Sequence, residues 1–312
     1  MKPTNPLPLL DGIKPSYLNL PHDKQYIGKP LLCYLRARFP FIAENIWRAR
    51  LNSGMVVNQR GEPLNEHTPF QAGETLFYYR EISRDAEPRI PFDEKILWLD
   101  NDLIVVDKPH FLPVTPSGRF LHETLLTRLR LHPDLQHLNT ADITPLHRLD
   151  KDTAGVMLFS HNPATRAAYH TLFPSRAIQK TYHALARTRT DLHYPLTVRT
   201  RLVPGEPFFL MREAAGEANA ETRVRLLEPR GEVSLYELQP VTGKKHQLRV
   251  QMMGLGMPLL NDALYPVVQP ENGDDYSKPL KLLAKRLAFI DPLTGAARAF
   301  ESGQDLCDWQ TD

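Results

Sequence analysis

A run of nine residues near the middle of the chain combines an acid, a base and a guanidinium, the groups that a covalent catalyst needs. The run spans residues 147–155 and reads His-Arg-Leu-Asp-Lys-Asp-Thr-Ala-Gly. Its central acid, Asp150, lies between a polar loop that begins at Pro145 and the strand-like segment 156–159. Such loop-to-strand corners commonly expose catalytic groups. An ordinary aspartate, with a pKa of about 3.9, is ionised and nucleophilic at neutral pH. Asp150 is therefore a candidate nucleophile.

Two later segments carry further groups that suit the same chemistry. Residues 180–184 read Lys-Thr-Tyr-His-Ala, and strand alternation places the lysine and the tyrosine on one face. Residues 242–249 read Thr-Gly-Lys-Lys-His-Gln-Leu-Arg, where a strand ends and a helix begins. Cations at a helix start oppose the helix macrodipole, so we expect an anion nearby, either the Asp150 carboxylate or a bound phosphate. A solvated basic face is the alternative.

These three segments resemble, in the same order, the motifs of one enzyme family. The motifs are H-R-L-D-x-x-T-S-G, K-x-Y-x-A and T-G-R-T-H-Q-L-R of the RluA-type RNA pseudouridine synthases, with Lys244 and Lys245 here in place of Arg-Thr. The resemblance extends over about residues 92 to 300. Within it, the 258–265 segment resembles the family's P-I-x-G-D-x-x-Y stretch, which we interpret as scaffold. Three motifs in one order are far more specific than any one of them.

The resemblance implies three catalytic residues. Asp150 is the expected nucleophile, and Arg249 is expected to pair with it and keep it ionised and aimed. Tyr182 is expected to pack against the flipped uracil and to assist the proton transfer that ends the reaction. Read without the family, Tyr182 is an ordinary aromatic residue of a strand in a core.

The resemblance also implies a set of RNA-binding residues. Arg148 is expected to fill the space left by the extruded uridine, because a planar guanidinium stacks on bases and binds phosphates. A surface salt bridge to Asp152 is the alternative for this residue. The other candidates are basic residues near the motifs and in the N-terminal region: His147, Lys180, Lys244, Lys245, His246, Arg36 and Arg48.

The segments around the motifs predict a small module ahead of a larger domain. Residues 1–28 are rich in proline and polar residues without sustained periodicity, so we expect an irregular N-terminal arm. Residues 29–80 show two short helical segments and then two short strands, an order that resembles the α-L RNA-binding module. In it Arg36 and Arg48 would face phosphates. The charged, proline-flanked residues 81–91 are the expected linker.

The larger domain, residues 92–312, is expected to be the catalytic domain. A hairpin of segments 96–99 and 103–106 around an Asp-Asn-Asp turn opens it. The resemblance implies an α+β pseudouridine synthase catalytic fold with a mixed, largely antiparallel central sheet flanked by helices and loops. The small helical and β RNA-binding module precedes it.

Composition sets limits on the class of protein. The chain has 312 residues, 38 basic and 36 acidic, with a formal charge of +2, so RNA binding has to rest on clusters of charge. Its two cysteines, Cys33 and Cys307, are far apart and predict neither a disulfide framework nor a zinc site. No apolar run approaches the roughly 18 residues that span a bilayer. We expect a monomeric, cytoplasmic protein with no membrane segment.

The function predicted from the sequence is isomerisation of specific uridines to pseudouridine in structured RNA, either rRNA or tRNA. The uridine is flipped out of its stack before Asp150 attacks. No metal or organic cofactor is expected, because the reaction involves no redox change. A non-catalytic RNA-binding protein is one alternative. A magnesium-dependent phosphatase is another, since residues 150–153 also spell D-x-D-x-T, but that loop belongs after a buried strand of a doubly wound sheet.

Overall fold

The structure is a computed structural model that describes residues 5–80, 87–270 and 275–306. The strands of residues 87–306 are β4 Lys95–Leu99, β5 Leu103–Lys108, β6 Thr144–Pro145, β7 Ala154–Ser160, β8 Ile178–Arg187, β9 Leu196–Pro204, β10 Met211–Ala214, β11 Ala220–Arg230, β12 Val233–Pro240, β13 Leu282–Ile290 and β14 Ala297–Glu301. The helices of this part are α3 Leu125–Leu131, α4 Arg166–Thr171 and α5 Gln247–Gly254.

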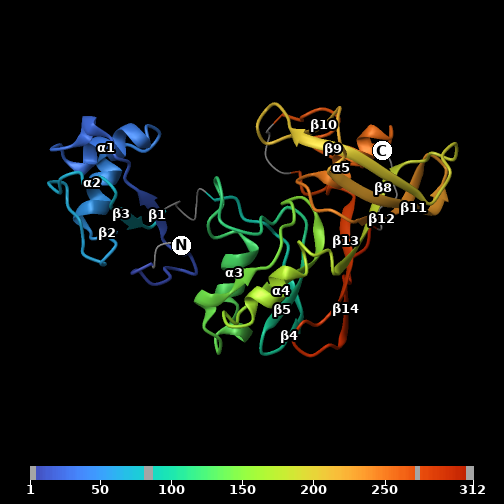
Figure 1. The fold of residues 1–312 in the computed structure, drawn as a ribbon, viewed down its shortest axis with the longest axis horizontal. Coiled ribbons are helices and arrows are strands. Elements are labelled where there is room, and N and C mark those ends of the chain that lie inside the picture. The colour runs from blue at the N-terminus through green and yellow to red at the C-terminus, as the bar shows by residue number, and fades with distance from the viewer. Residues whose placement is uncertain (1–4, 81–86, 271–274, 307–312) are drawn as a thin grey trace.

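These strands form one 11-stranded mixed sheet (Figure 1). Its main path runs β10-β9-β11-β12-β8-β13-β7-β5-β4, with β14 beside β13 and β6 beside β7. Among the strands of the described residues, only β13 and β7 pair in parallel, and every other neighbouring pair is antiparallel. The predicted α+β fold with a mixed, largely antiparallel central sheet is therefore confirmed. The predicted hairpin is confirmed too, as β4 and β5.

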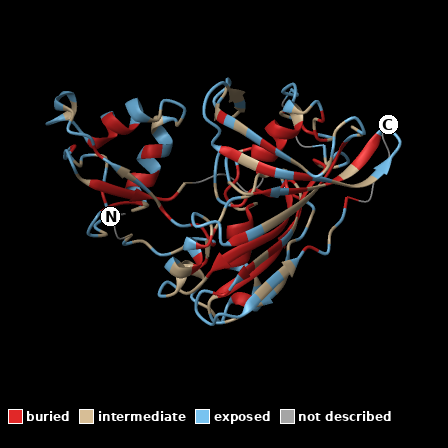
Figure 2. Cartoon of the chain, turned by 45° about the vertical axis from the view of Figure 1, so that its right-hand side comes forward, coloured by how far each residue is buried: buried red, intermediate tan, exposed pale blue. Residues whose placement is uncertain are grey.

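The middle of the sheet is buried on both faces. Every residue of β5 and β7 is buried, and Figure 2 shows the buried strands crossing the centre of the molecule. Successive side chains of a strand point to opposite faces, so Ile104 and Val106 pack in the cluster that contains residues of α3. Leu103 and Val105 pack instead with Tyr169 of α4. Because both faces are covered, these strands are continuous apolar runs rather than alternating ones.

The N-terminal module, residues 16–80, has its own sheet and core. Its helices are α1 Leu31–Arg38 and α2 Glu44–Asn52, and its strands are β1 Ser16–Asn19, β2 Val56–Asn58 and β3 Thr75–Tyr78. The strands pair antiparallel in the order β1-β3-β2. Both helices bury an apolar side against this sheet, and Trp47 at the centre of the core is fully buried.

The prediction of an irregular arm over residues 1–28 was wrong for its second half. Residues 16–19 form β1, and Leu20 is 3% exposed in the core of the module. A strand of four residues between prolines is too short to show a period of two, so its pairing with β3 was not visible in the sequence.

The predicted linker falls partly outside the described residues, which omit 81–86. The remainder is fixed to the larger domain. The buried carboxylate of Glu87 accepts hydrogen bonds from the backbone N–H groups of Leu121, His122 and Glu123, and Ile90 joins the core that contains α3. Within residues 5–80, 87–270 and 275–306, no helix combines the length and the apolar character needed to cross a bilayer.

Candidate active site

Asp150 lies in a loop that the backbone and two side chains hold at several points. We call residues 146–153, between β6 and β7, the Asp150 loop. The Leu146 N–H donates to the carbonyl of Leu158 at 2.9 Å, and the Leu158 N–H donates to His147 Nε2 at 3.0 Å. Within the loop, the Thr153 N–H donates to the Asp150 carbonyl at 3.2 Å. The carboxylate of Asp150 itself is 27% exposed, so a fixed loop presents a reachable nucleophile.

A buried lysine ties this loop to the neighbouring turn. Lys108 Nζ, at the end of β5, donates to the carbonyls of Pro109, Leu112 and Lys151, each at 2.9 Å. Burial lowers the pKa of Lys108 to about 7, and Asp152 and Asp150 partly oppose that shift. Three carbonyls in place of water leave this side chain saturated, so its role is to position the loop.

The glycine that ends the first motif is required by the sheet. Gly155 has φ +115°, and a Cβ built there would lie 2.3 Å from the carbonyl oxygen of Ala284 in β13. A side chain would therefore push apart the only parallel pair of the described sheet, β7 and β13. This close approach brings the Asp150 loop next to the strands that carry the other motifs.

Arg249 faces Asp150 but makes its strongest contacts with another acid. Its Nη1 lies 3.6 Å from Asp150 Oδ2. Its Nε donates to Asp262 Oδ2 at 2.8 Å and its Nη2 to Asp262 Oδ1 at 2.5 Å. The Arg249 side chain is 1% exposed and that of Asp262 is 0% exposed. Burial opposes the charge on Arg249, but the hydrogen bonds to Asp262 outweigh it and raise the pKa of Arg249 above its ordinary value.

Asp262 is a residue of the site that the sequence analysis missed, as are Lys108, Tyr265 and Leu282. Besides Arg249, Asp262 Oδ1 accepts the backbone N–H groups of Leu264 and Tyr265, at 2.9 and 3.1 Å. The carboxylate is therefore fixed by its own turn and in turn fixes the guanidinium, which leaves only Nη1 free to face Asp150. The segment 258–265 was interpreted as scaffold. The signal that could have found the residue was an acid and a tyrosine three residues apart in a family-like stretch.

His246 completes the shell around Asp150. Its Nε2 lies 3.9 Å from Asp150 Oδ2, and its Nδ1 is 2.8 Å from the hydroxyl of Tyr265. That hydroxyl accepts the N–H of Met211 at 2.8 Å, so its proton is free to be donated to Nδ1. Burial lowers the pKa of His246 to about 4. The ring is then neutral, with its Nε2–H directed at Asp150.

The second motif lies on strand β8, and the third lies in the loop before helix α5 and in the first turn of that helix. Tyr182 and Lys180 share one face of β8, as predicted. Helix α5 begins at Gln247, so Lys244 and Lys245 lie in the loop before the helix and not in its first turn. The reason is local: Gln247 Oε1 accepts the Thr242 hydroxyl at 2.7 Å and the Lys244 N–H at 3.0 Å. His246 takes a left-handed conformation (φ 53°) as the N-cap.

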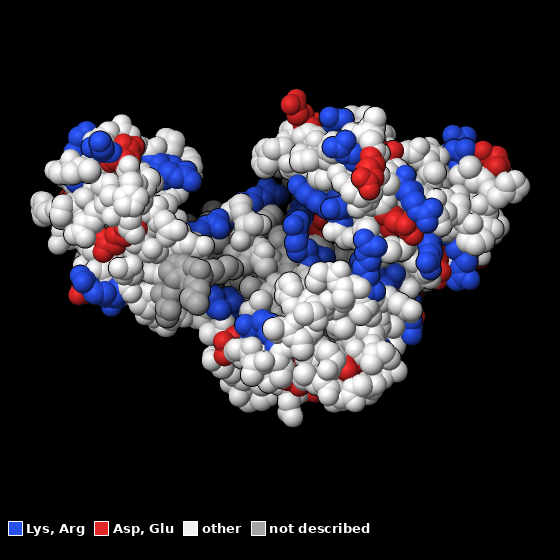
Figure 3. Space-filling model, viewed as in Figure 1, with Lys and Arg blue, Asp and Glu red and all other residues white. Residues whose placement is uncertain are grey.

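A cavity of about 660 Å³, the active pocket, opens in front of Asp150. Tyr182 and Leu282, from the paired strands β8 and β13, give it apolar walls on which a flat ring can stack. Burial and the nearby Asp150 charge raise the pKa of Tyr182, so the phenol stays protonated. Figure 3 shows Lys and Arg side chains gathered around a hollow in the middle of the larger domain.

The structure brings most of the predicted site residues together. Those that line the active pocket are Asp150, Tyr182, Arg249, Arg148, His147, Lys180, Lys244, Lys245 and His246. Arg148 is exposed, and the alternative salt bridge to Asp152 is not formed, because Asp152 pairs with Lys151 at 3.6 Å.

Five of the predicted RNA-binding residues have partners within the protein. His246 contacts the Tyr265 hydroxyl, and Lys180 Nζ donates to the carbonyl of Thr242 at 3.2 Å. His147 stacks on Phe173, and its Nε2 is bonded to the strand β7 backbone. Arg36 and Arg48 lie in the N-terminal module and not at the pocket. Both pair with Glu44, at 2.8 and 2.7 Å, and Arg48 also pairs with Glu66. Contact of these residues with RNA stays a prediction.

Comparison with known proteins gives consistent matches. The RNA pseudouridylate synthase family model matches residues 102–253. An RNA pseudouridine synthase of Synechocystis, described as uncharacterized, is 29% identical over 75% of this chain and 79% of its own length. The ribosomal large subunit pseudouridine synthase C of Vibrio cholerae is 30% identical over 59% of this chain and 56% of its own. The solved structure of human RNA pseudouridylate synthase domain containing 1 shares the fold, with a TM-score of 0.54 at 22% identity, over 70% of this chain and 86% of that one.

The family match covers all three motif segments, from before Asp150 to beyond Arg249. This places the protein in the class of RNA pseudouridine synthases, which are isomerases. The chain belongs to the RluA-type family within that class, as its motifs predicted. The two alternatives are not favoured. A D-x-D-x-T phosphatase needs a doubly wound parallel sheet, whereas this sheet has one parallel pair among the described strands, and a pure binder has no use for a fixed, reachable acid.

Proposed function

We propose that the protein converts uridine to pseudouridine in structured RNA, with Asp150 as the nucleophile. The observation that carries the proposal is the position of the Asp150 carboxylate, 27% exposed at the floor of the active pocket and 3.6 Å from a buried arginine. Arg249 supplies the counter-charge, and the neutral His246 adds a donor directed at the same oxygen, 3.9 Å away. Both groups orient the carboxylate toward the pocket.

The uridine has to leave its stack before it can reach this carboxylate, at a cost of a few kcal/mol. We propose that the exposed Arg148, which borders the active pocket, fills the space that the flipped uridine leaves in the stack. Lys180, Lys244 and Lys245 border the same pocket and suit the phosphates on either side of the flipped nucleotide. Tyr182 and Leu282 then enclose the uracil ring.

The reaction balances without a cofactor. Asp150 forms a transient covalent link to the nucleoside, the bond between uracil N1 and the ribose breaks, and the ring turns within the pocket. A bond from C5 to the ribose then forms and the link to Asp150 breaks, which restores the carboxylate. C5 loses its proton and N1 gains one. Because Tyr182 is held as a neutral phenol, we propose that it relays this proton, accepting it on oxygen while releasing its own.

The substrate is rRNA or tRNA, and the protein acts as a monomer in the cytoplasm. The N-terminal module, whose order of elements resembles an α-L RNA-binding module, is proposed to add affinity through Arg36 and Arg48. These arginines would have to exchange Glu44 for phosphate, so their contribution falls steeply with salt.

Mapping pseudouridines by chemical labelling of total RNA, with and without the gene for this protein, tests the function. We expect one or a few sites to disappear. Expression of the Asp152→Asn variant in the deletion strain restores these sites, because Asp152 pairs only with Lys151, at 3.6 Å, among the described ion pairs. Expression of the Asp150→Asn variant does not restore them. An unchanged pseudouridine map in the deletion strain contradicts the proposal.

A further inference from the structure

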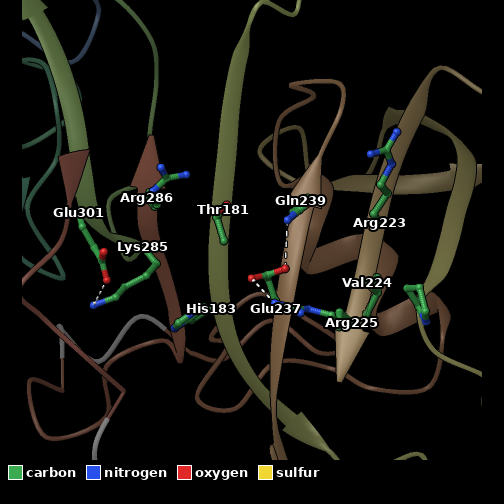
Figure 4. Close-up of a pocket in the computed structure, with 11 residues that line it drawn as sticks. Thr181, His183, Arg223, Val224, Arg225, Glu237, Gln239, Lys285, Arg286 and Glu301 are labelled. Carbon is green, nitrogen blue, oxygen red and sulfur yellow. Dashed lines mark hydrogen bonds and ion pairs between the residues drawn. The ribbon is translucent and has the colours of Figure 1, made fainter. Parts of the chain in front are cut away.

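The face of the sheet opposite the active pocket carries a second hollow, which we call the back groove. It measures about 520 Å³ and crosses β11, β12, β8 and β13 (Figure 4). Its floor uses the residues that alternate with those of the active site: Thr181 and His183 of β8 line it, whereas Lys180 and Tyr182 line the active pocket. The two hollows are therefore separated by one layer of strand.

One row of the back groove is neutralised by its own ion pairs. Arg225 and Glu237, opposite each other on β11 and β12, lie 3.0 Å apart. Lys285 and Glu301 lie 3.3 Å apart on β13 and β14. His183 stands between these pairs, and burial lowers its pKa below the ordinary value, so it adds no charge at neutral pH. This row presents no net charge to a ligand.

The next row carries two arginines that have no such partner. Arg223 is opposite Gln239, and Arg286 is opposite Thr181, so the order across the sheet is Arg, Gln, Thr, Arg. Within the described part of the chain, neither arginine makes a side-chain hydrogen bond or an ion pair, and both are exposed. Figure 4 shows both side chains extending toward the same end of the sheet. Three strand spacings separate them, about 14 Å.

The chemistry of this row selects its ligand. Two separated guanidinium groups match a chain of phosphates, each of which can take a bidentate pair of N–H donors. Between them lie the Thr181 hydroxyl and the Gln239 amide, whose Nε2 donates to Glu237 at 3.0 Å. Among the described residues that line the groove, only Val224 and Pro195 have apolar side chains, so this lining lacks the apolar centre of a protein interface.

We propose that the back groove binds the phosphate backbone of the RNA substrate at a segment remote from the target uridine. This inference rests on the proposed function, because it takes the ligand to be the same RNA. A short stem-loop that fills the active pocket cannot also reach the opposite face of the sheet. A large folded RNA can, so Arg223 and Arg286 contribute to the recognition of large substrates alone.

The test compares two double variants of the full-length protein. In R223Q/R286Q the two unpaired charges are lost. In the matched control R225Q/E237Q an ion pair is lost and the net charge of the groove is kept. Dissociation constants are measured over a series of salt concentrations, for a large folded RNA that contains the target uridine and for a short stem-loop around it. Thermal melting checks that both variants are folded.

We expect R223Q/R286Q to bind the large RNA more weakly and to lower the slope of log Kd against log salt by about 1 for each arginine. Its affinity for the stem-loop and its turnover at saturating stem-loop stay at the wild-type values, and the control binds both RNAs as the wild type does. An unchanged slope for R223Q/R286Q, or an equal loss in the control, overturns the inference. If neither RNA gains pseudouridine but the slope still changes, the proposed function is wrong, whereas the inference that the back groove binds RNA is supported.

Discussion

The central structural prediction concerns Asp262, whose loss should destabilise the fold, in contrast to loss of Asp150. Asp262→Asn removes the charge that faces a guanidinium 1% exposed to solvent and leaves at most one of two hydrogen bonds. Breaking a buried ion pair on one side costs about 3–5 kcal/mol. Asp150 remains 3.6 Å from Arg249 and compensates in part, so we expect a loss near the lower end, about 3 kcal/mol.

Asp150→Asn is the matched comparison. Its carboxylate is 27% exposed and makes no hydrogen bond to Arg249, only the 3.6 Å ion pair. A pair of this kind contributes less than about 1 kcal/mol. Urea titration of both variants measures the free energy of unfolding, and the two substitutions change the same number of atoms.

A double-mutant cycle isolates the pair itself. Arg249→Met and Asp262→Leu are each expected to lose about 3–5 kcal/mol, because each leaves one charge buried alone. The double variant loses much less than the sum, since neither charge remains. Additive losses in the cycle, or equal stability of Asp262→Asn and Asp150→Asn, would refute the assignment of Asp262 as the residue that fixes Arg249.

Three further predictions follow from the site. Tyr182→Phe keeps the apolar wall of the pocket and loses the hydroxyl, so kcat falls by about 10²–10⁴ while Kd for RNA is unchanged; single-turnover assays with a wild-type rate would rule out the relay. Lys108→Met leaves three buried carbonyls without their donor, which we expect to lower the free energy of unfolding by at least about 2 kcal/mol in urea titrations. The folded pKa values of His147 and His246, about 4, lie below the unfolded value of 6.5, so the unfolded chain binds more protons between these pH values. Stability is then fully present above pH 6.5 and decreases as the pH falls toward 4, and the decrease is smaller in His246→Gln; an identical pH profile for that variant argues against the burial of a neutral ring.

The sequence predicted what its motifs encode locally. Asp150, Tyr182 and Arg249 lie in separate segments, and the order of those segments was enough to predict that they form one site. The largely antiparallel sheet followed from the same resemblance, and the β4–β5 hairpin from its own turn residues. Each of these predictions rests on short sequence motifs that can be recognised without knowing which distant segments pack against them.

What the sequence did not predict depends on contacts between distant segments. The segment that contains Asp262 was interpreted as scaffold, and only the position of Asp262 against Arg249 shows that it anchors the guanidinium. Strand β1 needs β3 to be recognised as a strand. Helix α5 starts only at Gln247, because the Gln247 side chain accepts a hydrogen bond from the Thr242 hydroxyl. Helix propensities do not describe such a contact. The Arg36–Glu44 pair joins α1 to α2 and shows only once the helices are placed, whereas the Arg48–Glu44 pair has the i,i+4 spacing of one helix and was overlooked.

The most direct test of the account is a single assay with purified Asp150→Asn protein on an RNA that the wild type modifies, with Asp152→Asn alongside. We predict no pseudouridine above the level of a reaction without enzyme, at an RNA affinity equal to that of the wild type, while Asp152→Asn retains activity. Pseudouridine formation by Asp150→Asn at the wild-type rate would contradict the claim that this carboxylate is the nucleophile.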